Sequence, residues 1–318
     1  MLDSQNLFFV GGHSESNLFK TAIFASNDGG KNWVKRLEKV DGLFYGIYFI
    51  NKSVGFAISG RGNEGELFKS KDGGLSWRKI QSKFPDFIEE IQFLDELNGY
   101  AICSDDYFLT TKDGGESWAV SKMSIKNADS FYFRNEFNGW ILTNKGEIFQ
   151  TKNRGKIWFP EKDRFFALLK KWNPTELEFK RLKFVDSQTG YLAVRFQTIE
   201  RKENSEDKYI YDGGVVFSTR NGGKSWDVNI VTTDLGLWDA YFGQDGNFWV
   251  LTVWGYKEDV IFSSSDNGKT WERESIKGLE GIPRKIIFAN PKVGWLVTDG
   301  GTNVDYIYRT EDSGKTWR

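Results

Sequence analysis

Short runs in which apolar and polar residues alternate make up most of the chain, and turn residues separate one run from the next. The stretch from residue 46 to residue 70 is typical, with the runs GIYFI, VGFAIS and GELFKS. A period of two places successive side chains on opposite faces of a strand, so these runs predict β-strands. A helical period is visible only within residues 164–173, and no window approaches the roughly 18 uninterrupted apolar residues of a membrane-spanning helix. The pattern therefore predicts an all-β protein that is not embedded in a membrane.

One ten-residue turn recurs seven times between these runs. The copies read FASNDGGKNW, FKSKDGGLSW, LTTKDGGESW, FQTKNRGKIW, FSTRNGGKSW, FSSSDNGKTW and YRTEDSGKTW. They end at Trp33, Trp77, Trp118, Trp158, Trp226, Trp271 and Trp317, with spacings of 44, 41, 40, 68, 45 and 46 residues. A period of about 40 to 50 residues is typical of four-stranded propeller blades. We expect three strands before each turn, one strand after it, and insertions in the longest interval.

Each turn carries one Asp or Asn whose side-chain oxygen can accept hydrogen bonds from backbone N–H groups just ahead. These residues are Asp28, Asp72, Asp113, Asn153, Asn221, Asp266 and Asp312. The glycines that follow allow positive φ, a Ser or Thr two residues earlier offers a second local hydrogen bond, and the closing Trp can wedge between sheets. A calcium loop would need several oxygen ligands and a closing Glu, whereas each turn has one carboxylate and two turns have Asn instead. We therefore expect structural turns without a metal.

The turn motif S/T-x-D-x-G-x-S/T-W resembles the Asp-box, also called the bacterial neuraminidase repeat. The phrases GYAICSDDYFLTTKDGGESW and NGWILTNKGEIFQTKNRGKIW are similar to the photosystem II stability/assembly factor-like propellers, in which a G-W/Y-A-V strand and a G-x-I-x-x-T strand precede each box. This resemblance implies one seven-bladed propeller over residues 1–318. Asp-boxes also occur in sialidases, xyloglucanases and sortilin-type receptors, so the resemblance leaves the function open.

Seven blades of four strands would need 28 strands, and the pattern supplies 26 of them. Nothing ahead of residue 7 provides an inner strand for the first blade, and the last blade stops after its third strand at Arg318. We expect the ring to close imperfectly between the first and last blades.

Composition removes several classes of function. Lys and Arg number 43 against 44 Asp and Glu, and no basic run stands out, so we expect no nucleic-acid partner. One cysteine, Cys103, and one histidine, His13, allow neither an intramolecular disulfide nor a Cys/His zinc site. The N-terminus shows no signal sequence, which predicts a soluble protein, although an exported protein without its signal would look the same. We expect no cofactor.

Two insertions, residues 160–181 and 197–214, belong to the fifth blade and are expected on the face opposite the box turns. Seven of the 13 Trp residues close boxes and three lie in second strands, which leaves three in or beside loops of blades five and six. With neighbouring Tyr and Arg residues they form our candidate binding set: Trp172, Tyr209, Tyr211, Trp238, Trp254, Tyr256, Arg181 and Arg284. Exposed aromatic rings anchor protein partners and also stack on sugars. Alternatively, the insertions pack their own aromatic side chains and merely cover the blade.

Charged residues are expected where the inner strands begin. They are Glu89, Glu90, Asp129 and Asp239, together with Lys180, Arg181, Arg284 and Lys285. Glycoside hydrolysis needs two carboxylates roughly 5 to 9.5 Å apart, but the sequence shows no F-R-I-P-type motif of the kind sialidases carry. We expect a rim whose mixed charges offset one another, or a patch that recognises a charged peptide. The leading hypothesis is a non-catalytic scaffold that binds a protein client; the alternative is a propeller that binds or cleaves carbohydrate.

Overall fold

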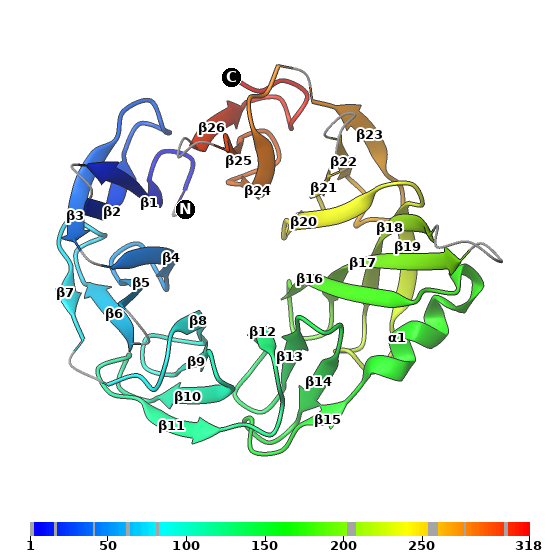
Figure 1. The fold of residues 1–318 in the computed structure, drawn as a ribbon, viewed down its shortest axis with the longest axis horizontal. Helices are drawn as coiled ribbons and strands as arrows, with labels where there is room; N and C mark the ends of the chain where they lie inside the picture. Colours follow the sequence, from blue (N-terminus) through cyan, green and yellow to red (C-terminus); the bar gives the residue numbers. More distant parts are fainter. Residues whose placement is uncertain are drawn as a thin grey trace. The chain divides into compact units, whose positions relative to one another are not determined.

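The computed structural model describes residues 3–15, 18–40, 42–61, 64–80, 83–201, 208–253, 260–276, 278–301 and 305–318. It is an all-β, seven-bladed propeller, as the alternation and the repeats predicted (Figure 1). Helix is confined, in these residues, to α1 (Lys162–Leu168) and the 3-10 helix η1 (Lys170–Trp172), within the segment where a helical period was expected. None of the helices in the described ranges has the length and apolar character needed to cross a bilayer.

The chain forms two compact units, one of residues 1–143 and 151–157 and the other of residues 144–150 and 158–318. In the first unit, blade one contains β1 (Leu7–Glu15), β2 (Leu18–Ser26) and β3 (Val34–Val40). Blade two contains β4 (Leu43–Phe49), β5 (Gly55–Arg61), β6 (Glu64–Ser70) and β7 (Arg78–Lys79). Blade three contains β8 (Ile88–Phe93), β9 (Gly99–Cys103), β10 (Tyr107–Thr111) and β11 (Ala119–Lys122). Blade four contains β12 (Ala128–Phe133), β13 (Gly139–Thr143), β14 (Ile148–Thr151) and β15 (Phe159–Pro160), and the division between the units passes through it.

The second unit holds the remaining blades. Blade five contains β16 (Glu176–Phe184), β17 (Gly190–Arg201), β18 (Lys208–Thr219) and β19 (Asp227–Thr232). Blade six contains β20 (Gly236–Phe242), β21 (Phe248–Val253), β22 (Val260–Ser264) and β23 (Glu272–Ser275). Blade seven contains β24 (Ile282–Phe288), β25 (Gly294–Asp299) and β26 (Asp305–Thr310). Every blade is an antiparallel meander, and blades one and seven have three strands each in the described residues, which confirms the predicted strand count.

Aromatic pairs join neighbouring blades within each unit. In the first unit, Phe56 of β5 stacks on Phe93 of β8 with ring centroids 4.7 Å apart, and Tyr100 of β9 stacks on Phe133 of β12 at 3.9 Å. The second strand begins with glycine because a Cβ on Gly99 would lie 2.7 Å from the ring of Phe93. In blade three the phrase is therefore a packing element: Gly99 admits the ring of Phe93 from its own blade, and Tyr100 stacks on Phe133 of the next.

The box turns share one set of hydrogen bonds, which blade two illustrates. The Ser70 hydroxyl donates to Asp72 Oδ1 (2.8 Å) and accepts the N–H of Gly74 (2.8 Å). Asp72 also accepts the backbone N–H of Ser76 at Oδ1 (2.9 Å) and its hydroxyl at Oδ2 (2.5 Å). Corresponding Ser/Thr-to-Asp/Asn bonds are present in the other six boxes. The box side chains thus satisfy donors of their own turn, and the indole of Trp77 donates to Gly74 O (3.1 Å).

Replacing Asp72 by alanine should lower the melting temperature, whereas Asp72→Asn should stay close to the wild type at neutral pH. Asparagine keeps the acceptor oxygen, and Asn153 and Asn221 occupy the same position in blades four and five. Hydrogen bonds from Ser76 and Ser70 hold the pKa of Asp72 at about 2, below its usual 3.8. The carboxylate therefore stabilises the fold fully above about pH 4, and this contribution disappears as the pH falls towards 2. Melting curves between pH 7 and pH 2.5 would contradict this role if Asp72→Asn lost stability in acid as steeply as the wild type.

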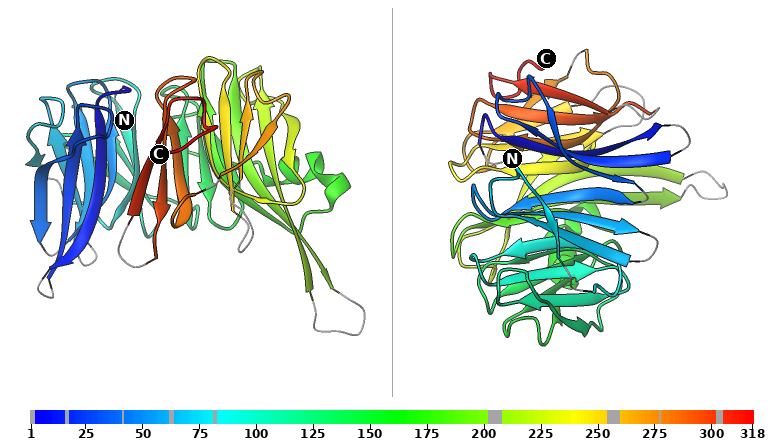
Figure 2. Two further views of the ribbon diagram at one scale, coloured as in Figure 1. Left: turned by 90° about the horizontal axis from the view of Figure 1, so that it is seen from above. Right: turned by 90° about the vertical axis from the view of Figure 1, so that its left-hand side faces the viewer.

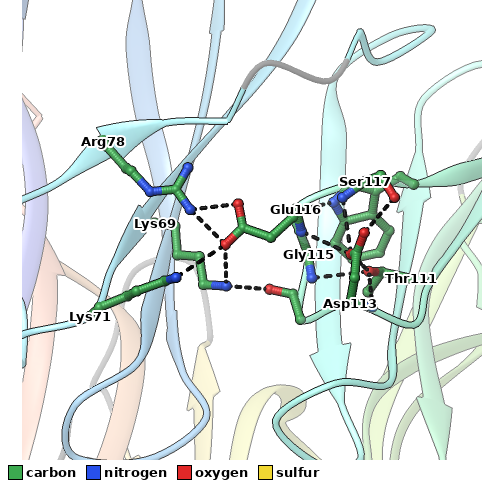
Figure 3. A network of polar contacts seen from close by, with 10 residues as sticks. Lys69, Lys71, Arg78, Thr111, Asp113, Gly115, Glu116 and Ser117 are labelled. Atoms are coloured by element: carbon green, nitrogen blue, oxygen red, sulfur yellow. Dashed lines mark hydrogen bonds and ion pairs between the residues drawn. The ribbon is translucent and has the colours of Figure 1, made fainter.

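A buried lysine connects blades two and three in the first unit (Figure 3). Lys69 of β6 is 6% exposed, and its Nζ donates to Gly114 O (2.6 Å) and to Glu116 Oε1 (2.9 Å) in the box of blade three. Arg78 donates to both carboxylate oxygens of Glu116, and Lys71 Nζ lies 3.5 Å from Oε1. Burial tends to raise the pKa of Glu116, but the hydrogen bonds from Arg78 and Lys69 outweigh it and hold this pKa at about 2. The box of one blade therefore also holds the adjacent blade.

Candidate functional site

The structure gives side-chain positions for half of the candidate binding residues. Trp254 and Tyr256 lie outside the described residues, as do the side chains of Tyr209 and Tyr211, whose backbones belong to β18. The others, Trp172, Arg181, Trp238 and Arg284, all belong to the second unit.

The first insertion forms a structural cover for blade five. Phe165 of α1 is 1% exposed, and its ring contacts those of Phe217 (4.9 Å between centroids) and the box residue Trp226 (5.8 Å). Arg164 donates to the carbonyl groups of Gly223 and Lys224 in the same box turn. The expectation that this insertion lies on the face opposite the boxes is therefore wrong for α1. The apolar side of the helix is buried on the flank of blade five and extends to its box turn.

The rest of this insertion packs against the second one. The ring of Trp172 is half-buried and lies 6.1 Å from that of Phe196, and the Thr198 hydroxyl donates to Trp172 O (2.8 Å). The N–H of Thr175 donates to Gln197 O (2.8 Å). Trp172 therefore supports the base of the β17–β18 hairpin, as the alternative interpretation of the insertions predicted for their aromatic residues.

The β17–β18 hairpin projects beyond the other strands of the second unit (Figure 2). Its strands pair with each other from Gly190 and Thr219 as far as Arg201 and Lys208. At its base, Arg195 binds Asp212 through two hydrogen bonds of 2.8 and 2.9 Å. This bidentate pair fixes the direction in which the hairpin leaves the blade.

A β-bulge interrupts the first strand of every blade from two to seven, always at the same place. At each bulge one residue has no opposite residue in the register of the second strand. From blade two to blade seven these residues are, in order, Tyr45, Glu89, Asp129, Lys180, Trp238 and Arg284. A bulge inserts one extra residue and re-aims the side chains around it. We call the extra residue and the one after it a bulge pair.

The bulge pairs differ in charge between the two units. Those of the first unit are Tyr45–Gly46, Glu89–Glu90 and Asp129–Ser130, and those of the second unit are Lys180–Arg181, Trp238–Asp239 and Arg284–Lys285. The first set contains three acidic residues and no basic ones, whereas the second contains four basic residues and one acidic residue. The expected offsetting of mixed charges is present in the second unit, where Asp239 contacts Arg181 and Lys285, and Glu178 and Asp299 pair with Lys180 and Arg284. The bulge pairs of the first unit carry acidic residues only.

Trp238 is the centre of the basic set. It is half-buried on β20, with Lys180 Nζ of blade five 5.2 Å from its ring centroid and Arg284 Cζ of blade seven 5.3 Å away. Cations at these distances are attracted by the face of an indole ring. Lys180 also binds Glu178 (2.5 Å), and Arg284 binds Asp299 (3.0 Å). One aromatic side chain thus holds basic groups from both flanking blades on a common surface, which we call the Trp238 cluster.

Asp239, the next residue, is buried. Its Oδ1 accepts a hydrogen bond from Arg181 (2.9 Å), and its Oδ2 accepts the backbone N–H of Ile286 in β24 (3.1 Å). Glu90 occupies the equivalent position in blade three, and its Oε2 accepts the N–H of Phe131 (2.8 Å). Two of the four carboxylates that the sequence offered as catalytic candidates, Glu90 and Asp239, therefore connect a blade to the next one.

The described residues contain no group of three or more His, Cys, Asp or Glu side chains placed to hold a metal ion. Cys103 is buried in β9, where burial raises the pKa of its thiol to about 12, so it is not a nucleophile at neutral pH. Sequence reasoning missed the bulges, although a signal was present. Two consecutive residues outside the core break the alternation in IEEIQF, LEFKRLKF and IPRKIIF, at the position where each bulge occurs.

Comparison with known proteins agrees with the repeats. The family model of photosynthesis system II assembly factor YCF48 matches residues 69–162. The chloroplastic photosystem II stability/assembly factor HCF136 of Guillardia theta is 26% identical over 183 residues, which cover 51% of this chain and 39% of the relative. The chain thus spans about two fifths of the length of that protein.

Solved structures share the fold. A structure of YCF48 bound to D1 peptide superposes with a TM-score of 0.58 and 20% identity, covering 86% of this chain and 80% of the other. A GH74 xyloglucanase from Xanthomonas campestris gives a TM-score of 0.64 at 11% identity, and the match covers all of this chain and 55% of the enzyme. At these identities the superpositions support the fold alone. The repeats, the blades and these partial matches together support an Asp-box propeller that is similar, over part of its length, to the photosystem II assembly factors.

Proposed function

We propose that this protein is a non-catalytic scaffold that binds a protein client through the face of blades five and six opposite the box turns. The observation that carries the proposal is the Trp238 cluster, in which the ring of Trp238 and the basic groups of Lys180 and Arg284 form one surface across three blades. An amphipathic ring flanked by basic side chains is typical of anchors in protein interfaces. The YCF48 structure with bound D1 peptide supports a polypeptide as the ligand class.

The charges of the surface favour a client segment that carries carboxylates. Arg181, Arg284 and Lys285 expose 36%, 41% and 52% of their side chains, whereas Asp239 exposes 7%. Glu178 and Asp299, the partners of Lys180 and Arg284, expose 37% and 43% of their side chains, so they offset part of this positive charge. Such complementarity accelerates encounter and selects partners, and it weakens as salt is added.

The geometry gives less support to the carbohydrate alternative. A sugar-stacking platform needs an accessible ring face, and basic groups from both sides already lie over Trp238. The carboxylates of Glu90 and Asp239 are engaged with backbone N–H groups of the next blade. Saturable binding to a defined glycan in a broad panel would favour the alternative over a protein client.

The scaffold proposal predicts that a client captured from lysate of the source organism is lost when Trp238 is replaced by alanine. We expect the same loss when residues 199–212 of the hairpin are replaced by a short Gly/Ser turn. Phe159→Ala is the matched control, because Phe159 is 54% exposed and lies on the outer strand β15 of blade four. Quantitative pull-downs with all four proteins should show the client with the wild type and the control only. If a variant carrying both changes retained every partner while melting like the wild type, the proposed site would be wrong.

A further inference from the structure

The Asp239 carboxylate interacts with three blades at once. From β20 of blade six it accepts hydrogen bonds from Arg181 of blade five (2.9 Å) and from the backbone N–H of Ile286 of blade seven (3.1 Å). Lys285 Nζ of blade seven lies 3.7 Å from Oδ2. Only 7% of the Asp239 side chain is exposed, whereas Arg181 and Lys285 expose 36% and 52%, so solvent screens these ion pairs from one side.

A carboxylate can connect one blade to the next without contacting basic side chains from both flanking blades. In blade three, Glu90 accepts the N–H of Phe131. Asp239 combines the same backbone contact with two basic side chains that belong to the bulge pairs on either side of Trp238. Asp239 therefore connects two basic side chains to the backbone N–H of Ile286, in addition to connecting blade six to blade seven.

We propose that Asp239 is a positioning residue of the client site: its buried carboxylate holds the basic groups of Arg181 and Lys285, which follow Lys180 and Arg284 of the Trp238 cluster in the chain, so that they meet the carboxylates of a client already in place. This inference rests on the proposed function. Long basic side chains lose considerable conformational freedom when they bind a ligand, and a side chain that is already ordered loses less. The planar guanidinium of Arg181 gains most, because its fork must be oriented to bind a carboxylate.

Asp239→Asn distinguishes a positioning role from an effect of net charge, because the two predict opposite changes in the affinity for an acidic ligand. The amide keeps an acceptor oxygen for the N–H of Ile286 but removes a negative charge from a basic surface. If charge alone determined binding, an acidic ligand would bind more tightly. If Asp239 orders Arg181 and Lys285, the same ligand should bind about tenfold more weakly, within the range of coupling between contacting residues.

The probe is a fluorescein-labelled hexaglutamate peptide, titrated by anisotropy at low salt, with hexalysine as the charge-reversed peptide. Positioning predicts that Arg181→Gln and Asp239→Asn each weaken hexaglutamate binding. It also predicts that the double variant loses less than the sum of the two, because only the part that acts through Lys285 adds to the loss in Arg181→Gln. A purely structural role predicts additive losses that accompany a lower melting temperature. Glu90→Gln is the matched control, since it alters the equivalent contact in blade three and should leave the affinity unchanged.

Tighter or unchanged binding by Asp239→Asn, or additive losses, would overturn the positioning role. A different result is expected if the Trp238 cluster is not a client site at all. In that case the wild type does not bind hexaglutamate, or Trp238→Ala and Lys180→Ala bind as the wild type does, and the positioning role is rejected together with the site. The positioning role would be established if Asp239→Asn bound hexaglutamate more weakly at an unchanged melting temperature and if the losses in Asp239→Asn and Arg181→Gln were not additive.

Discussion

Replacing Phe165 by alanine should lower the free energy of unfolding by about 3–5 kcal/mol, the usual cost of removing a fully buried aromatic ring. The ring is 1% exposed and lies between those of Phe179, Phe217 and Trp226, at centroid distances of 5.7, 4.9 and 5.8 Å. Its loss would leave a cavity between α1 and blade five that rigid strands cannot fill. The measurement is a urea titration followed by circular dichroism.

The matched control is Leu168→Ala on the same helix. Leu168 is 36% exposed, so its truncation should cost far less than that of Phe165. Equal effects of the two substitutions would mean that α1 is not an integral part of blade five. A large effect confined to Phe165 would show that an inserted helix, which the box repeat does not contain, has become part of the core of the blade.

Replacing Glu116 by glutamine should destabilise the contact between blades two and three. The change leaves the buried Lys69 ammonium without its carboxylate, although Gly114 O remains within 2.6 Å. Breaking a fully buried ion pair costs about 3–5 kcal/mol; because 37% of Glu116 is exposed, we expect about 1–2 kcal/mol. Lys69→Met should cost less, since it removes the buried charge and keeps most of the volume.

The double variant and the pH dependence test this interpretation. Combining Lys69→Met with Glu116→Gln should recover part of the loss, because no buried charge is then left unpaired. Since the folded pKa of Glu116 is about 2 and its usual value is 4.5, the difference between wild type and Glu116→Gln should be largest above about pH 4.5 and shrink as the pH falls towards 2. A difference that stayed constant down to pH 2.5, or strictly additive losses, would contradict the role of the ion pair.

Most of the fold could be predicted from the sequence because its main signal is repeated seven times. Each box combines local hydrogen bonds that need no distant partner, as between Ser70 and Asp72. The position of α1 could not be predicted in the same way. A short amphipathic segment indicates that one side is buried, but not that Phe165 reaches the box residue Trp226 of a strand more than fifty residues away.

The candidate site was predicted less completely, for a related reason. Trp238 was selected because it is an aromatic residue outside the repeated positions, and it does lie beside Arg284. The separation of acidic and basic bulge pairs was missed because it depends on a bulge in each first strand, and a bulge shifts the register of every side chain before it. Asp239 was considered as a catalytic acid, since nothing in the sequence indicates that the N–H of Ile286 would be its partner.

The bulge pairs also affect how readily this protein can acquire a new specificity. Because the extra residue of each pair has no cross-strand partner in the ladder, its side chain can change without altering the alternation that builds the core. Within each unit, three such positions recur at the same place on successive blades. Exchanging Lys180 for glutamate, the residue at the same position in blade three, would be a small step in sequence that leaves the contact of Arg181 with Asp239 in place and changes the charge that a client meets.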